Sequence, residues 1–264
     1  MKYKRTLALF LCLLLVLAAG CKENAPDASG NGQVDIRQSD GRYETQLFAM
    51  DTVMELAAYG TGARLALIEA ADLIRELDAL FSVTDTQSDI YRINHNAGQF
   101  TAVDERTLEV IEKSLAISRQ TGGHFDITIF PVVQAWGFNT ADPQVPDAAV
   151  LEGAVEKVGF EGIEIEGGRI RIAEGMGLDL GAVAKGYASQ AVIDLFRQRG
   201  LESAMVSLGG NIQLLGRKPD DSPWKVGVRD PVNQNGIFCM LSLSDAAVVT
   251  SGSYIRYFTE DNVD

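Results

Sequence analysis

Apolar residues recur at two spacings along the chain, and the change of spacing predicts where strands and helices lie. Residues 43–59 alternate on either side of residues 50–52, which predicts two strands joined there. Over residues 63–81 the apolar positions form a helical stripe opposite charged side chains, so we expect a long amphipathic helix. Asp104 can cap a second helix that reaches about residue 120, and residues 146–159 favour a short third one.

The second half of the chain is richer in strand patterns than in helical ones. Residues 163–172 predict a hairpin that turns at Gly167-Gly168, and residues 203–216 predict a strand interrupted by a glycine pair. Further strands are expected at residues 224–229, 237–242 and 246–250. The polar stretch 82–94 is expected to be a loop, either an exposed binding loop or a plain connection. Together these elements predict an α+β fold in which helices pack on mixed sheets.

Residues 177–189 are the most informative stretch, because their pattern changes half-way. Alternation over 177–180 predicts a short buried strand, and the stripe that begins at Val183 predicts a helix ending at Gly200. Such a helix points its free N–H groups and the positive end of its dipole beyond the strand, where anions bind. Lys185 adds a positive charge there and Asp179 a carboxylate. A phosphate, cation or nucleotide site is one interpretation, and a helix-packing glycine turn with a surface lysine is the other.

Residues 124–138 form a second candidate region, with His124 followed closely by Asp126. Their aromatic side chains are more typical of a core than of a ring-stacking site. The chain has two histidines, and neither has a metal-binding spacing or a cysteine partner, so zinc has no support. Gly209 and Gly210 inside a strand pattern indicate a bulge or a ligand close to the backbone. The hydroxyl side chains at residues 250–253 suit either phosphate binding or a turn.

The N-terminus has the form of an export signal. Cations within the first five residues precede an apolar run at residues 7–19, which is too short for a comfortable membrane span. The small residues that lead to Cys21 resemble the lipobox of bacterial lipoproteins. We therefore expect residues 1–20 to be removed and Cys21 to be lipidated, with ordinary signal cleavage as the alternative. Residues 21–42 are polar and rich in Gly, Asp and Asn, which predicts a flexible tether.

Charge and cysteine content narrow the class of protein further. The formal net charge is −13, and such a surface repels nucleic acid and anionic headgroups. We expect no nucleic-acid partner, and we expect attachment through the lipid alone to the extracytoplasmic face of a bacterial cell membrane. Cys12 would leave with the signal and Cys21 would carry lipid, so Cys239 has no cysteine left for an intrachain disulfide.

Seven short motifs follow one another along the chain. They are MDT at 50–52, a serine-rich loop ending in Asn94, HFDITIFPVVQAWGF at 124–138, LDLGAVAKGYA at 178–188, SLGGN at 207–211, WKVGVRDP at 224–231 and TSGSYIRYF at 250–258. In this order they resemble the ApbE family of FAD:protein FMN transferases, over residues 45–258. The resemblance implies a two-lobed, T-fold-like α+β domain over residues 43–264, with FAD in the cleft between its lobes.

The activity that the resemblance implies is a Mg²⁺-dependent transfer of the FMN half of FAD to a threonine hydroxyl of an exported acceptor protein, with release of AMP. Typical acceptors are flavin-carrying subunits of electron-transport complexes. The backbone carbonyl of Ala182 is implied as one Mg²⁺ ligand, and main-chain oxygens are ordinary ligands of a hard cation. No catalytic residue is assigned. FAD contacts are implied for Met50, Thr84, His124, Phe125, Asp126, Asp179, Lys185, Gly209, Gly210 and Asn211.

The sequence departs from the family pattern at its end. In the family the last motif is followed by an H-x-x-D-P-x-T-G stretch and by an Asp and a Thr, four apart, that supply the other metal ligands. The sequence ends at Asp264 without them, so we expect a C-terminally incomplete chain that binds Mg²⁺ and FAD poorly. Two other functions stay open: an FAD pyrophosphatase that forms FMN and AMP, and a flavin- or solute-binding lipoprotein without turnover.

Overall fold

A computed structural model describes residues 34–138, 140, 143–233 and 236–252. The predicted signal, Cys21 and most of the predicted tether lie outside these ranges, as does the end of the last motif. Val34 is already buried and Arg37–Ser39 form strand β1, so the folded part begins earlier than the expected boundary at residue 43. Within the described ranges, none of the helices has the length and apolar content needed to cross a membrane.

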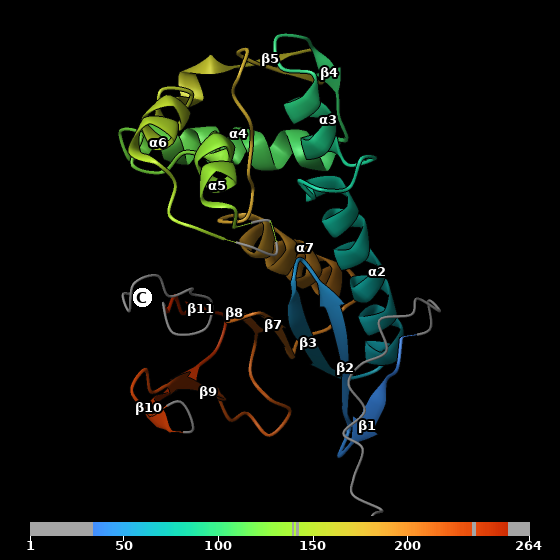
Figure 1. The fold of residues 1–264 in the computed structure, drawn as a ribbon. Helices are drawn as coiled ribbons and strands as arrows, with labels where there is room; N and C mark the ends of the chain where they lie inside the picture. The colour runs from blue at the N-terminus through green and yellow to red at the C-terminus, as the bar shows by residue number, and fades with distance from the viewer. Residues whose placement is uncertain (1–33, 139, 141–142, 234–235, 253–264) are drawn as a thin grey trace, which may run out of the picture. The chain divides into compact units, whose positions relative to one another are not determined.

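The main sheet has six strands in the order β1-β2-β3-β7-β8-β11, and all of its neighbours pair antiparallel (Figure 1). Strands β2 and β3 pair over their whole length, from Arg42 opposite Tyr59 to Ala49 opposite Thr52, as the alternation predicts. After β1, the strands are Arg42–Ala49, Thr52–Tyr59, Ala204–Leu208, Asn211–Leu215 and Ala247–Val249.

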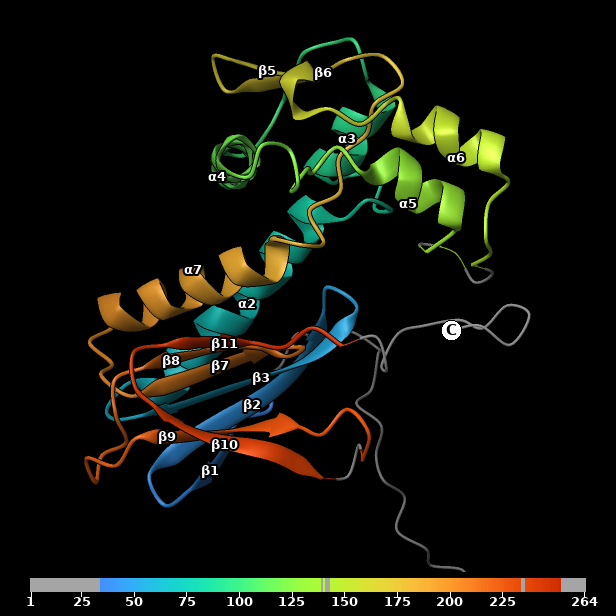
Figure 2. The ribbon, with the colours of Figure 1, turned by 90° about the vertical axis from the view of Figure 1, so that its left-hand side faces the viewer.

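Two long helices cover one face of this sheet (Figure 2). Helix α2 spans Ala63–Phe81 and helix α7 spans Ala184–Gln198. Alternate residues of β3, Met54, Leu56 and Ala58, are fully buried with them because side chains of a strand point to opposite faces in turn. The sequence predicts both helices, and α7 ends at Gln198, with Arg199 as its C-cap and Gly200 following at a positive φ of 73°.

The opposite face of the sheet carries a separate hairpin. Its strands β9 (Trp224–Arg229) and β10 (Ile237–Leu243) pair antiparallel. Trp224 and Val226 pack with Leu214 of β8 in a second apolar cluster. Figure 2 shows the hairpin below the sheet and the two helices above it.

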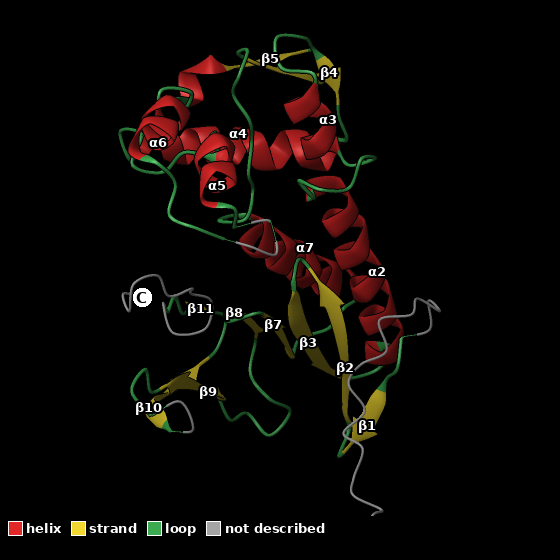
Figure 3. Cartoon of the chain, in the orientation of Figure 1, coloured by secondary structure: helices red, strands yellow, loops and turns green. Residues whose placement is uncertain are grey.

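A second group of elements lies on the side of α2 and α7 that faces away from the main sheet (Figure 3). It consists of a three-stranded sheet in the order β4-β6-β5 and four short or medium helices. The described residues from Val34 to Gly252 nevertheless belong to a single compact unit. The hairpin predicted at residues 163–172 is present, and Asp104 caps α4 by accepting a hydrogen bond from the backbone N–H of Arg106. The elements are α3 (Asp89–His95), β4 (Thr101–Ala102), α4 (Glu105–Gln120), α5 (Phe130–Trp136), α6 (Ala148–Val155), the single turn η1 (Phe160–Gly162), β5 (Ile163–Glu166) and β6 (Arg169–Ile172).

The structure confirms the α+β class and corrects three local predictions. Residues 89–95, expected to belong to a loop, form α3, because Ser88 caps it by accepting a hydrogen bond from the N–H of Tyr91. Residues 177–180 are largely buried, but they form no regular element and pair with no strand in the described ranges. Residues 203–216 are two strands joined by Gly209 and Gly210, so the glycine pair reverses the chain instead of forming a bulge.

The aromatic residues at 124–138 also depart from expectation. Only Phe130 is buried, while Phe138 is 56% exposed and stacks on the half-buried Trp136 with ring centroids 5.7 Å apart. This pair is therefore not part of the core, although large aromatics usually are.

Candidate functional site

Several predicted site residues gather at one end of the main sheet. The turn between β2 and β3, at Met50 and Asp51, and the turn between β7 and β8, at Gly209 and Gly210, lie at this end, since β3 and β7 are antiparallel neighbours. Figure 2 shows the β2–β3 turn and the end of β11 at the end of the sheet toward which α7 points its first turn. Segments more than a hundred residues apart in the sequence therefore meet here.

The two turns are in close contact. A Cβ atom placed on Gly209 would lie 2.6 Å from the Oγ1 atom of Thr52, closer than real Cβ contacts. The carbonyl of Gly210 accepts a hydrogen bond of 3.2 Å from the N–H of Thr250, which brings the end of β11 to the same place. The close approach that the sequence allows for a ligand at Gly209 is thus occupied by a side chain of the protein.

The β2–β3 turn is strained and rests on the end of α2. Met50 and Asp51 both have positive φ angles, 48° and 56°, which are unfavourable for residues other than glycine. Asp78 of α2 accepts a backbone hydrogen bond from Met50. Burial raises the pKa of the Asp78 carboxyl, the Met50 hydrogen bond lowers it, and the Asp51 and Asp85 carboxylates raise it again.

Asn211 connects the sheet to α7. Its side chain is buried, and its Nδ2 atom donates a hydrogen bond of 3.1 Å to the Oγ atom of Ser189. Ser189 donates in turn to the carbonyl of Gly186, in the first turns of α7. Asn211 therefore orients the beginning of the helix, whatever further contact it makes with a ligand.

Asp126 organises the chain before α5. Its Oδ1 atom accepts hydrogen bonds from the N–H and the hydroxyl of Thr128, at 2.8 and 2.7 Å, and its Oδ2 atom accepts one from the N–H of Phe160 at 2.9 Å. Thr128 accepts from the N–H of Gly159 at 2.8 Å. Both carboxylate oxygens thus hold two loops together, a role that the sequence does not reveal.

Asp179 lies between Asp126 and the beginning of α7. Its N–H donates to the carbonyl of Ile127, the residue after Asp126, at 2.8 Å. Its Oδ1 atom accepts from the N–H of Gly181 at 2.7 Å, which bends the chain toward α7. The segment before the bend is held by Asn94, whose side chain makes two hydrogen bonds with Leu178.

The first turn of α7 has the features of an anion site. The N-cap residue, Val183, makes no side-chain capping bond, and no acidic residue lies in the first turn. Lys185 is half-buried there, and Ala182 lies in the exposed turn just before the helix. The N–H groups of Val183 and Ala184 already donate to the carbonyl of Leu180, so the helix dipole and the Lys185 cation are what favour a negatively charged ligand here.

Helix α4 braces the same part of α7. The Tyr187 hydroxyl donates to the Oε2 atom of Glu109 at 2.6 Å, and Lys113 pairs with the Oε1 atom of Glu109 at 2.8 Å. The lysine and the tyrosine hydroxyl hold the pKa of the Glu109 carboxyl below its usual range. Burial, and next the Glu109 hydrogen bond, raise the pKa of Tyr187.

Two predicted residues are more peripheral. His124 is exposed, and Thr84 is exposed in the loop after α2, where its hydroxyl lies 3.2 Å from that of Ser82. Phe125 is half-buried against the core. Within the described ranges no three His, Cys, Asp or Glu side chains converge on a point where a metal ion would bind.

The model of the ApbE family matches residues 50–264, which include all of these segments. The chain belongs to the ApbE family. It is 32% identical over 217 residues to the FAD:protein FMN transferase of Treponema pallidum, covering 75% of this chain and 60% of that protein. It is 30% identical over 255 residues to the FAD:protein FMN transferase of Vibrio cholerae, covering 94% of this chain and 73% of that protein.

Solved ApbE structures share the fold. The crystal structure of the ApbE protein of Thermotoga maritima superposes with a TM-score of 0.80 at 29% identity, covering 84% of this chain and 74% of that one. The flavin transferase ApbE of Vibrio cholerae gives a TM-score of 0.74 at 27% identity, covering 83% and 74%. The chain thus spans about three fifths to three quarters of the length of these ApbE relatives.

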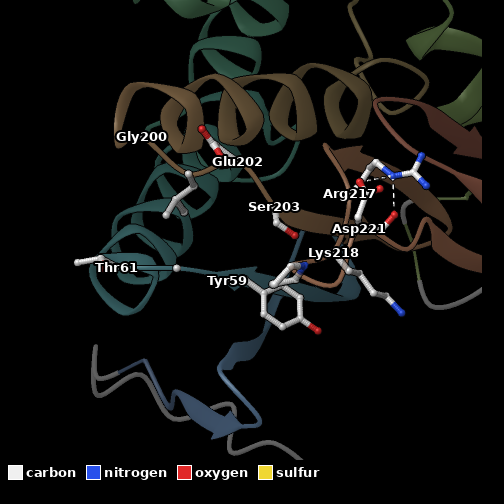
Figure 4. A pocket seen from close by; sticks show the side chains of 11 residues that line it. Tyr59, Thr61, Gly200, Glu202, Ser203, Arg217, Lys218 and Asp221 are labelled. Atoms are coloured by element: carbon white, nitrogen blue, oxygen red, sulfur yellow. Dashed lines mark hydrogen bonds and ion pairs between the residues drawn. The ribbon is translucent and has the colours of Figure 1, made fainter.

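A cavity of about 650 Å³ lies at the opposite end of the main sheet (Figure 4). It is lined by residues such as Tyr59, Ser203 and Lys218, and by none of the predicted flavin contacts. Arg217 and Asp221, which both line it, form an ion pair at 3.0 Å. The predicted flavin contacts at the turns of the main sheet lie at its other end, which is therefore the candidate flavin site.

Proposed function

We propose that this ApbE protein transfers the FMN half of FAD to a threonine hydroxyl of an exported acceptor protein and releases AMP. In this reaction the hydroxyl oxygen bonds to the phosphorus atom on the FMN side of the pyrophosphate. The bond from that phosphorus to the bridging oxygen breaks, AMP leaves with the bridging oxygen, and the hydroxyl proton is released. Phosphoryl transfer of this kind needs positioning and charge neutralisation more than covalent help from the protein.

One observation carries the proposal: in a member of the ApbE family, three of the motifs are hydrogen-bonded to the chain that enters α7 or to its first turns, through Asn94 to Leu178, Ile127 to Asp179 and Asn211 to Ser189. Amide groups at the beginning of a helix, together with Lys185, suit a pyrophosphate. Asp179, Met50 and Asn211 lie on the segments that surround this point. The relatives named FAD:protein FMN transferase support the same reaction.

The proposal includes Mg²⁺, which would neutralise the pyrophosphate when bound. Ala182 fits this part in one respect, because its carbonyl belongs to an exposed turn next to the proposed anion site. The described side chains do not complete a metal site. The proposed contribution of this part of the chain is to hold the anion and the flavin.

We also propose that the protein acts outside the cytoplasm, anchored by lipid at Cys21. The order of cations, apolar run and small residues before this cysteine supports export and lipidation. An acceptor that is itself exported would meet the enzyme there. Labelling with a radioactive fatty acid, in the natural chain and in Cys21→Ala, tests the anchor, and equal labelling of both would contradict it.

A flavin-transfer assay tests the activity. The full-length gene product is mixed with FAD, MgCl₂ and an acceptor protein, flavin on the acceptor is read by in-gel fluorescence, and AMP is measured by chromatography. We expect both signals. Charge reversal by Lys185→Glu is expected to reduce transfer by about tenfold or more, which corresponds to about 1.4 kcal/mol of lost stabilisation. Lys225→Glu, at an exposed position on β9, is the matched control and should retain activity.

The other outcomes distinguish the alternatives. AMP and FMN without labelled acceptor would indicate an FAD pyrophosphatase. Stoichiometric FAD binding without AMP would indicate a binding protein. Unchanged transfer by Lys185→Glu would refute the placement of the pyrophosphate at the first turn of α7.

A further inference from the structure

The segment that leads into α7 is buried without belonging to a sheet. Leu178 is fully buried, and its N–H and carbonyl groups both need hydrogen-bond partners there. The Oδ1 atom of Asn94 accepts from the N–H of Leu178 at 2.6 Å, and the Nδ2 atom of Asn94 donates to its carbonyl at 2.9 Å. One side chain thus supplies the two bonds that an antiparallel strand would supply to a residue.

Only an amide side chain can make this pair of bonds. Asparagine and glutamine carry a donor and an acceptor side by side, whereas an ionised aspartate carries acceptors alone. Glutamine is longer by one methylene group, so its amide would lie further from the helix that bears it. The interaction of Asn94 with Leu178 therefore requires both an amide group and the side-chain length of asparagine.

The helix that bears Asn94 is held in place by contacts of its own. Asn94 lies in the last turn of α3, where the buried Asp89 pairs with Arg92 and accepts a hydrogen bond of 2.8 Å from the N–H of Asp104. These contacts tie α3 to the beginning of α4. The helix that bears Asn94 is thus held independently of the segment that Asn94 binds.

The position of the residues after Leu178 depends on the same two hydrogen bonds from Asn94. Asp179 is held on its other side by the carbonyl of Ile127, and its side chain sets the bend at Gly181 that leads to Ala182. A shift of Leu178 would be passed along this short segment to the carboxylate of Asp179 and to the carbonyl of Ala182. No other element in the described ranges pairs with the segment as a strand.

We propose that Asn94 is a positioning residue for the flavin site, which holds Asp179 and Ala182 in the place that flavin binding and transfer require. The inference rests on the proposed function and deepens it. Asn94 would not touch the reacting atoms. Asn94 would act through Leu178, and removal of its amide would move the carboxylate of Asp179 and the carbonyl of Ala182.

Three substitutions separate chemistry from length. Asn94→Ala removes both bonds, Asn94→Asp keeps only the acceptor, and Asn94→Gln keeps both groups but displaces them. Asn96→Ala is the matched control, because the exposed side chain of Asn96, the C-cap residue of α3, donates to the carbonyl of Arg92 in that helix, at 2.8 Å, and not to residues 177–180. All variants are made in the full-length gene product.

Three readouts are needed: FAD affinity from quenching of flavin fluorescence, kcat and KM of flavin transfer, and hydrogen exchange of residues 177–183. For Asn94→Ala and Asn94→Gln we expect about 10- to 100-fold lower kcat/KM, since misplacements of about 1 Å have such effects. Exchange at residues 177–183 should rise in all three Asn94 variants. Asn94→Asp should bind FAD better than Asn94→Ala, and Asn96→Ala should match the natural chain.

Several results would overturn the proposal. If Asn94→Ala and Asn94→Gln stay folded and keep kcat, KM and FAD affinity within threefold, Asn94 has a structural role only. If hydrogen exchange at residues 177–183 is unchanged in the Asn94 variants, the hydrogen bonds from Asn94 do not hold the segment. If the natural chain binds FAD but transfers nothing, the proposed function fails while affinity and exchange still decide the role of Asn94. If it does not bind FAD at all, both proposals fail.

Discussion

Replacing Gly209 by alanine tests the contact between the two turns at the candidate site. The φ angle of Gly209 is +59°, and its new Cβ atom would lie 2.6 Å from Oγ1 and 2.7 Å from Cγ2 of Thr52. The left-handed conformation costs about 1 kcal/mol for a residue with a side chain. Overpacking against Thr52 adds about 1–3 kcal/mol. We therefore expect Gly209→Ala to lower the free energy of unfolding by about 2–4 kcal/mol.

Urea and thermal unfolding measure this change directly. For a domain of this size, about 1 kcal/mol shifts Tm by about 2–4 °C, so the expected fall is roughly 4–16 °C. Gly210→Ala is the matched comparison. Its φ angle of +93° is also unfavourable, but the nearest atom to a new Cβ, Oγ1 of Thr250, is 3.4 Å away. Gly210→Ala should therefore lower the free energy of unfolding mainly by the cost of the left-handed backbone conformation.

A double variant isolates the steric term. Thr52→Ala removes the two atoms that the new Cβ would meet most closely, so Gly209→Ala combined with Thr52→Ala should recover about 1–2 kcal/mol relative to additivity. If Gly209→Ala destabilises no more than Gly210→Ala, and Thr52→Ala gives no recovery, the two turns are not in the contact described and the reasoning is refuted.

Two further substitutions test the carboxylates around the site. Because folding raises the pKa of Asp78 above 3.8, ionisation of Asp78 lowers stability as the pH rises through and above that value. Asp78→Asn, which keeps an acceptor for Met50, should therefore have a higher Tm than the natural chain at pH 7 and the same Tm at pH 3. A variant that is less stable at pH 7 would contradict this. Asp126→Asn replaces one fully bonded oxygen by an N–H donor and should cost about 1–3 kcal/mol in urea unfolding. Asp147→Asn, at an exposed helix start without a capping bond, should change it by less than about 0.5 kcal/mol, and equal effects would contradict the assignment.

The sequence pattern is sufficient for most of the regular elements. Helix α2 and strands β2 and β3 follow from spacing alone, because each buries one stripe or one face against a single core. Asp104 and Gly200 also mark helix ends correctly, since caps depend on local hydrogen bonds. The sequence pattern does not reveal helix α3, because its polar capping residues are as frequent in loops.

The order of the motifs also indicates the family, and the family model confirms it. Asp179, Lys185 and Gly209 all occur on segments that the structure places around one end of the sheet and the beginning of α7. Their roles differ from the expectation in part, because Gly209 packs against Thr52 and Asp126 uses both its oxygens on backbone and hydroxyl donors.

By itself, then, the sequence determined the local elements, the export signal as a prediction, and membership of a family. Only the tertiary structure decided that residues 177–180 are held by the side chain of Asn94, that the glycine pair is a turn, and that Asn211 orients α7. The physical reason is the distance along the chain between the residues that interact. Periodicity and capping depend on neighbours in the chain, whereas a hydrogen bond between residues 84 positions apart depends on how the whole core packs.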